Sequence, residues 1–198
     1  RIFFVGNTMI DTLKANFDRL RPPALWNVES LEPKQYFVLT LHRPNNVDER
    51  EQLLAMLNAI SEGTRGYKVI FPVHPRTSKM LKELDGELPG FVYAEPMGYL
   101  EFNYLVNNCM AVITDSGGIT EEATVMGVPC LTLRDTTERP ETVTVGTNEL
   151  VGTDPSKLKP ALDRLFAGQW KKGGIPEKWD GKTGERICTV LEQLLDGE

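Results

Sequence analysis

The chain has 198 residues, of which 40% are hydrophobic and 25% charged, as in a globular domain with one substantial core. Its net charge of −6 argues against a nucleic-acid partner, because a surface that binds nucleic acid needs an excess of Lys and Arg to neutralise phosphates. No apolar stretch approaches the roughly 20 residues of a membrane-spanning helix, so no membrane partner is expected either.

Short apolar runs predict the strands of the fold. They lie at residues 36–41, 68–73, 91–94, 111–114 and 129–133, with a weaker strand near Leu150. Each run is nearly continuous in apolar character, as in parallel strands that are buried on both faces. Segments of helical periodicity separate these runs and predict helices at residues 8–20, 48–62, 77–84, 100–107, 119–126, 156–166 and 183–195.

The repeated order of strand and helix predicts a single α/β domain over residues 1–198. Its architecture is a doubly wound, mainly parallel sheet with helices on both faces. Residues 168–182 (GQWKKGGIPEKWDGK) contain several Gly and Lys residues and are predicted to form a linker before the last helix. The chain opens at Arg1 without an initiator methionine, so we expect it to be a piece of a larger protein.

The three cysteines indicate a compartment. Cys109, Cys130 and Cys188 lie far apart and lack the close spacing of a zinc site or of a disulfide framework. No basic and apolar leader opens the chain. Together these features predict a cytoplasmic protein.

Polar residues follow four of the predicted strands at the point where each strand ends. Both histidines of the chain are among them, His42 after the first strand and His74 after the second. The motif DSGG (115–118) follows a third strand, and RDTTERPE (134–141) follows a fourth. In a parallel sheet these strand ends lie along one carboxyl edge, where ligands bind in such folds.

The motif around Gly117 and Gly118 predicts an anion site. Glycines lack a Cβ, so their backbone can adopt unusual dihedral angles and approach a ligand, and N–H groups at a helix start attract a phosphate. Ser116 can donate its hydroxyl to the same oxygens. An alternative is a tight turn that binds nothing, in which Ser116 is only the N-cap of the helix.

Glu121 and Glu122 follow on the same predicted helix. Successive helical side chains point about 100° apart, so one carboxylate can face the ligand cleft and the other solvent. A carboxylate beside a phosphate site can accept two hydrogen bonds from a ribose diol. The alternative is a solvated acidic pair at a helix start, which the helix dipole favours.

Arginines add positive charge at the same edge of this acidic protein. Arg139 in RDTTERPE offers a planar fork suited to phosphate oxygens, although this loop can also be read as a surface loop of salt bridges. Arg43 lies beside His42, and Arg76 lies near His74. Neither histidine has the paired spacing of a metal site, and the nearby Asp and Glu residues do not complete one, so we predict neither a metal nor another cofactor.

These motifs resemble the C-terminal domain of the non-hydrolysing UDP-N-acetylglucosamine 2-epimerase family. The resemblance covers nearly the whole chain and rests on FVGNTMIDTL, LTLHRPNNVDE, FPVHPRT, DSGGITEEA, RDTTERPE and DGKTGERICTVL. That family has the two-domain GT-B architecture, with the nucleotide between two Rossmann-like halves. The resemblance implies that the chain is the C-terminal, UDP-binding half, and that the N-terminal catalytic half lies outside these 198 residues.

The resemblance also implies roles for individual residues. UDP and UDP-N-acetylhexosamine are the implied ligands, and a homodimer of the full-length enzyme is compatible with it. His42 matches the histidine near the reacting sugar and is the candidate catalytic residue. The implied substrate-binding residues are Ser116, Gly117 and Gly118 for the diphosphate, Arg139, Arg43 and His74 for further phosphate contacts, Glu122 for ribose, Phe102 for stacking on uracil, and the backbone near Met97 for the base edge. By its sequence context alone, Phe102 is instead a core aromatic of a short helix.

The family's reaction eliminates UDP from C1 as the C2 proton is removed, which gives 2-acetamidoglucal, and then adds UDP back with protonation from the opposite face. The residues that move the C2 proton lie in the N-terminal half. Two other readings remain open. One is the UDP-binding half of a GT-B glycosyltransferase, and the other is a non-catalytic nucleotide-sugar-binding module.

Overall fold

The computed structural model describes residues 1–81 and 88–196. Its core is a six-stranded sheet in the order β3-β2-β1-β4-β5-β6, in which every pair of neighbours is parallel. The central strand β1 aligns Val38 with Ile70 of β2 on one side and with Val112 of β4 on the other. The strands are β1 (Tyr36–Thr40), β2 (Lys68–Pro72), β3 (Phe91–Ala94), β4 (Ala111–Thr114), β5 (Cys130–Thr132) and β6 (Asn148–Leu150).

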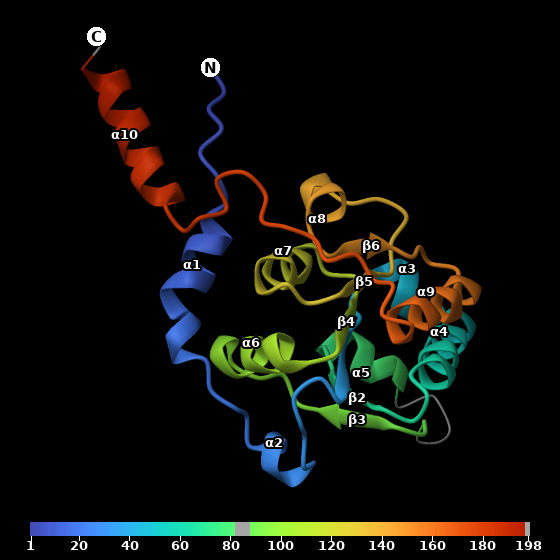
Figure 1. Ribbon diagram of the computed structural model, residues 1–198. Coiled ribbons are helices and arrows are strands. Elements are labelled where there is room, and N and C mark those ends of the chain that lie inside the picture. The colour runs from blue at the N-terminus through green and yellow to red at the C-terminus, as the bar shows by residue number, and fades with distance from the viewer. Residues whose placement is uncertain (82–87, 197–198) are drawn as a thin grey trace.

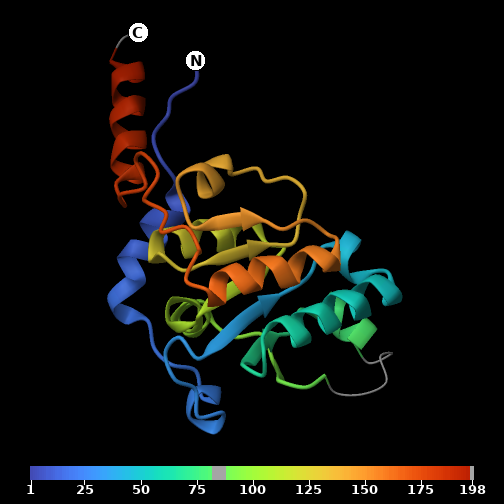
Figure 2. The ribbon, with the colours of Figure 1, turned by 45° about the vertical axis from the view of Figure 1, so that its right-hand side comes forward.

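Both faces of the sheet are buried, because successive side chains of each strand point to opposite sides. Along β1, Phe37 and Leu39 join one apolar cluster, while Tyr36 and Val38 join a second. The first cluster includes residues of α3 (Pro44–Val47), α4 (Arg50–Gly63) and α9 (Leu158–Phe166), and the second includes residues of α6 (Tyr99–Asn108) and α7 (Gly117–Met126). The helices therefore cover both faces, as predicted (Figures 1 and 2).

Two helices near the chain ends lie beside each other. The last helix, α10 (Thr183–Leu195), stands away from the sheet next to the N-terminus (Figure 1). Asp11 of α1 (Thr8–Asn16) accepts hydrogen bonds from the backbone N–H groups of Thr183 (3.1 Å) and Gly184 (2.7 Å). A side chain of the first helix thus caps the last one, which ties the two ends of the chain together.

The predicted strands are all confirmed to within one residue or two at their ends, including the weak one near Leu150. Short helices are the main difference, because segments of four or five residues show no periodicity. Of these, α3 and α8 (Pro140–Thr144) each have a proline in the first helical turn, where its missing N–H costs nothing. The other short helix that was not predicted is α2 (Leu25–Val28). The predicted helix 8–20 is confirmed as α1 followed by the 3-10 helix Phe17–Arg19, and the predicted helix 156–166 as the 3-10 helix Pro155–Lys157 followed by α9.

The long helices lie where periodicity predicts them, with shifted ends. Of the predicted helix 77–84, residues 82–84 lie outside the described residues, and the described part is α5 (Pro75–Leu81). The helix predicted at 119–126 begins two residues earlier, at Gly117. Among the helices of the described ranges, none has the length and apolar character needed to cross a membrane.

Candidate ligand site at the carboxyl edge of the sheet

The polar junctions predicted from the sequence meet at one place. The strands that precede them are consecutive in the sheet, in the order β2-β1-β4-β5, so their carboxyl ends share one edge. Chain order reverses between β1 and β4, and ligands of open α/β sheets bind at such a switch point. His42 follows β1 and Asp115 follows β4, so these two residues face each other across it.

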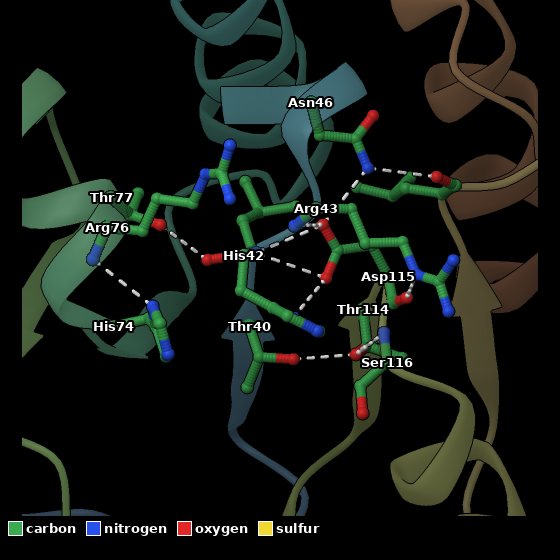
Figure 3. A network of polar contacts seen from close by, with 12 residues as sticks. Thr40, His42, Arg43, Asn46, His74, Arg76, Thr77, Thr114, Asp115 and Ser116 are labelled. Carbon is green, nitrogen blue, oxygen red and sulfur yellow. Dashed lines mark hydrogen bonds and ion pairs between the residues drawn. The ribbon is translucent and has the colours of Figure 1, made fainter. Parts of the chain in front are cut away.

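Asp115 is the centre of a buried network at this switch point (Figure 3). Its side chain is 0% exposed. Oδ1 lies 2.8 Å from Nδ1 of His42, and the backbone N–H of His42 donates to both carboxylate oxygens at 3.2 and 3.1 Å. Oδ2 also accepts from the backbone N–H of Arg43 (2.9 Å) and from Nδ2 of Asn46 (3.1 Å). One carboxylate therefore fixes both the loop after β1 and the imidazole that the loop carries.

The start of α7 lies beside this network. The Oγ1 atoms of Thr40 and Thr114 are 2.6 Å apart, and Oγ1 of Thr114 accepts from the backbone N–H of Ser116 at 3.0 Å. Ser116 occupies the N-cap position of α7, but within the described residues its side chain makes no capping hydrogen bond. The simple capping role is thus not seen, and the first N–H groups of the helix are without a side-chain cap.

The two glycines differ from the prediction. Both lie inside the first turn of α7, and neither has a positive φ, so the expectation of unusual dihedral angles is wrong. A Cβ at Gly118 would lie 2.9 Å from Cε of Met9, whereas a Cβ at Gly117 would meet no described atom closer than 3.7 Å. The close atom at Gly118 is the end of the flexible Met9 side chain, and the contact at Gly117 is an ordinary van der Waals distance, so packing alone does not require glycine at either position.

A cavity of about 540 Å³ opens at this edge. His42 and Ser116 line it from the switch point, His74 from the loop after β2, and Met97 and Phe102 from the segment around α6. Phe102 also packs against the second apolar cluster, so it is both part of a core and part of the cavity wall. One end of the cavity is thus apolar and the other is polar, as a ligand with a ring and a charged group requires.

Both acidic residues of α7 are buried, so the expectation that one of them faces solvent is wrong. Glu121 is 2% exposed and Glu122 is 5% exposed. Glu121 pairs with Nε of Arg139 and accepts from Nδ2 of Asn7 at 2.8 Å. The reason is that α1 covers one side of α7 and α6 covers the other, which leaves neither position open to solvent.

Glu122 points toward α6. Nδ2 of Asn103 lies 3.5 Å from its Oε1, and the hydroxyl of Tyr99 hydrogen-bonds the same carboxylate. Burial raises the pKa of Glu122, while the hydrogen bonds from Tyr99 and Asn103 act in the opposite direction. A carboxylate held beside the residues that flank Phe102 is suitably placed for the hydroxyls of a ligand whose ring lies at Phe102.

Carboxylates neutralise more of the arginine charge at this edge than the sequence predicts. Arg76 donates Nε and Nη2 to Asp48 at 2.9 and 2.6 Å. Arg134 donates both terminal nitrogens to Glu138 at 2.7 and 2.6 Å, and this pairing lowers the pKa of Glu138 to about 2. A carboxylate of the same loop and one from the end of α3 therefore neutralise much of the predicted positive edge.

Two arginines are held differently. Arg139 donates Nε to Glu121, and Arg43 donates Nε to the backbone carbonyl of Asp115 at 2.9 Å. Within the described residues no hydrogen bond engages the terminal nitrogens of either side chain, and Nη2 of Arg43 lies 3.7 Å from Glu138. Both guanidinium groups are thus anchored through Nε, and their ends can still bind an anion.

The sequence did not identify four residues of this site. They are Asp115, Asn46, Tyr99 and Asn103, and all four act through partners that are distant in the chain or on the neighbouring helix. For Asp115 a signal was present, because an Asp directly after a buried strand, at the same edge as His42, is placed to hold that histidine. Groups of three or more His, Cys, Asp or Glu that could hold a metal ion do not occur in residues 1–81 and 88–196.

Comparisons with known proteins agree with this geometry. A family model described as UDP-N-acetylglucosamine 2-epimerase matches residues 1–192. The UDP-N-acetylglucosamine 2-epimerase of Methanocaldococcus jannaschii is 42% identical over 206 residues, which cover 96% of this chain and 54% of that protein. The chain thus spans about half the length of the curated relatives that it matches.

Solved structures show the same similarity. The M. jannaschii UDP-GlcNAc 2-epimerase in complex with UDP-GlcNAc and UDP matches with a TM-score of 0.83 at 40% identity, over 97% of this chain and 55% of that one. The Neisseria meningitidis UDP-GlcNAc 2-epimerase bound to UDP-GlcNAc matches with a TM-score of 0.78 at 28% identity, over 96% and 55%. The predicted fold class, a Rossmann-like α/β sheet of the GT-B type, is confirmed. The chain belongs to the UDP-N-acetylglucosamine 2-epimerase family.

Proposed function

We propose that the chain is the UDP-binding half of an enzyme that interconverts UDP-GlcNAc and UDP-ManNAc. The observation that carries this proposal is the cavity at the switch point, which is lined by five of the residues expected to bind or act on the substrate: His42, His74, Met97, Phe102 and Ser116. The relatives whose structures contain UDP-GlcNAc share this half of the fold.

The nucleotide is expected to span the cavity from its apolar to its polar end. Uracil stacks on Phe102 with its edge at the backbone near Met97, and the ribose hydroxyls bind Glu122. The diphosphate binds at the start of α7, where the N–H groups of Gly117 and Gly118 and the hydroxyl of Ser116 can donate to it. The terminal nitrogens of Arg139 and Arg43, together with His74, supply further donors to the phosphates.

This arrangement suits a reaction in which UDP is the leaving group. As UDP leaves C1 of the sugar, negative charge develops on the diphosphate, and donors fixed before the reaction stabilise that charge. The proton at C2 is removed and returned by residues of the N-terminal half. We therefore expect the chain alone to bind UDP weakly and not to epimerise its nucleotide sugar, whereas the full-length enzyme, as a homodimer, does so.

Glu122 must exchange partners when the ribose binds. Its carboxylate holds the hydroxyl of Tyr99 and the amide of Asn103 in the free chain. A ribose diol can replace these two donors by two hydroxyl donors. Glu122→Gln is therefore expected to weaken binding of UDP and uridine and to leave binding of inorganic pyrophosphate unchanged.

Calorimetric titration tests the proposal. UDP is titrated into the wild-type chain, into Ser116→Ala, and into Ser156→Ala as a control, because Ser156 is an exposed serine after β6 that does not line the cavity. We expect measurable binding to wild type, unchanged binding to the control, and a loss of roughly 1–3 kcal/mol in Ser116→Ala, the scale of a hydrogen bond to a charged group. Equal affinities in all three proteins, or epimerisation by the pure chain, would contradict the proposal.

A further inference from the structure

The two histidines of the chain lie together at the carboxyl edge of the sheet. The centroids of their rings are 5.9 Å apart, with the planes inclined by 47°, and both rings line the same cavity. They are held in different ways. Nδ1 of His42 contacts the carboxylate of Asp115 at 2.8 Å, whereas Nδ1 of His74 accepts a hydrogen bond from the backbone N–H of Arg76 at 3.2 Å (Figure 3).

The partner of each Nδ1 determines where a neutral ring carries its proton. An ionised carboxylate only accepts hydrogen bonds. Asp115 accepts from two backbone N–H groups and from the amide of Asn46, so the contact with His42 is completed by a proton on Nδ1 of that ring. Nδ1 of His74 accepts from an N–H group and must therefore be unprotonated, which places the proton of that ring on Nε2.

We propose that Asp115 is a positioning residue that holds His42 in the Nδ1-protonated tautomer, opposite to that of His74. The two rings then present unlike Nε2 atoms to the cavity. Nε2 of His42 is a proton acceptor, and Nε2–H of His74 is a donor.

The opposite tautomers suit two parts of one ligand, in an extension that rests on the proposed function. A sugar hydroxyl can donate to Nε2 of His42, while a phosphate oxygen, which only accepts, can bind Nε2–H of His74. Asp115 acts on the ligand only through His42, because its own oxygens are turned toward the protein and its side chain is 0% exposed.

Nitrogen-15 NMR of the imidazole rings tests the proposal directly. The chain has two histidines, so long-range proton–nitrogen spectra contain two ring systems, which His74→Gln assigns. At a pH where both rings are neutral, we expect a protonated Nδ1 in His42 and a protonated Nε2 in His74. The same tautomer in both rings, or a protonated Nε2 in His42, would overturn the proposal without any variant at Asp115.

Variants then isolate the carboxylate. In Asp115→Asn an amide faces the backbone donors, and we expect His42 to shift toward the Nε2-protonated form that an unconstrained histidine side chain favours, while the signals of His74 stay in place. Asp48→Asn, which removes the exposed partner of Arg76, is the matched control. It should leave both the tautomer and the signals of His42 unchanged. An unchanged His42 in folded Asp115→Asn would overturn the proposal.

These spectra need no nucleotide, so they fail or succeed independently of the proposed function. A chain with opposite tautomers that does not bind UDP would refute the proposed function and retain the positioning role. A chain that binds UDP with both rings in one tautomer would retain the proposed function and refute the positioning role.

Discussion

The junction between β1 and β4 and the loop after β5 both belong to the candidate site, but they are built differently. At the junction Asp115 is completely buried, and all of its hydrogen bonds come from groups that are fixed by the fold. In the loop after β5, Arg139 and Glu138 are about half exposed or more. The first region is therefore suited to hold one side chain in one orientation, and the second is suited to bind an anion by direct charge.

The largest expected effect is a loss of stability when Asp115, at the junction between β1 and β4, is replaced. Asp115→Ala should lower the free energy of unfolding by about 3–5 kcal/mol, because several buried donors lose their acceptor at once. Asp135→Ala, in the exposed loop after β5, is the control and should change it by less than about 0.5 kcal/mol. Denaturant unfolding of both variants measures the difference. Similar midpoints for the two variants would mean that the buried network does not stabilise the fold.

The second region should respond in binding. Arg139→Ala is expected to weaken UDP binding by roughly 1–3 kcal/mol, since a charge-assisted contact is lost. Arg139→Lys should recover only part of this, because Lys keeps the charge but cannot use one nitrogen as an anchor and two others as a fork. Arg164→Ala is a close control, because both arginines form an ion pair and their side chains are similarly exposed, 46% for Arg164 and 49% for Arg139. Calorimetry showing equal losses for Arg139 and Arg164 would remove the phosphate assignment.

The pH dependence of stability distinguishes Glu122 from the exposed carboxylates. Because burial raises the pKa of Glu122, the folded chain keeps this proton at a pH where the unfolded chain has lost it. Stability contributed by Glu122 is therefore present at low pH and decreases as pH rises from its ordinary pKa of ~4.3 toward the raised value. The Tm of Glu122→Gln should accordingly rise relative to that of wild type as the pH is raised from about 4 to about 7. A constant difference between the two proteins would contradict the burial argument.

The smallest effect is expected at Glu138, whose pKa Arg134 lowers to about 2. For a carboxylate with a lowered pKa, stability changes with pH in the opposite direction. The stabilisation is complete above the unfolded value of ~4.3 and is lost as pH falls through the folded value. Glu138→Gln should therefore lower Tm slightly at neutral pH and match wild type in strong acid. A difference in Tm between variant and wild type that does not change with pH would show that the pair with Arg134 contributes nothing.

Much of the fold could be predicted because its signals are local. A strand such as β4 is a continuous apolar run, and a helix such as α4 repeats its apolar residues at helical spacing. Short helices such as α3 contain too few residues for a repeat. The predicted start of α7 lies two residues too late, because Gly117 and Gly118 have low helix propensity and yet belong to the first turn of the helix.

The residues of the candidate site likewise fall into those that local sequence signals could assign and those that depend on tertiary contacts. His42, His74 and Ser116 follow strands and could be assigned to one edge from the order of elements alone. Asp115 could be placed at the same edge, but its pairing with His42 and Asn46, which lie 73 and 69 residues away in the chain, depends on β1 and β4 being neighbours in the sheet. Pairings such as Arg139 with Glu121 likewise depend on which helix covers which, and periodicity cannot show that.

A crystal structure of the chain with UDP tests the central claim most directly. The account predicts the diphosphate at the amino end of α7, within hydrogen-bonding distance of the N–H groups of Gly117 and Gly118 and of a terminal nitrogen of Arg139, with uracil on Phe102. A nucleotide bound away from the carboxyl edge of the sheet, or one whose phosphates touch neither α7 nor Arg139, would contradict it.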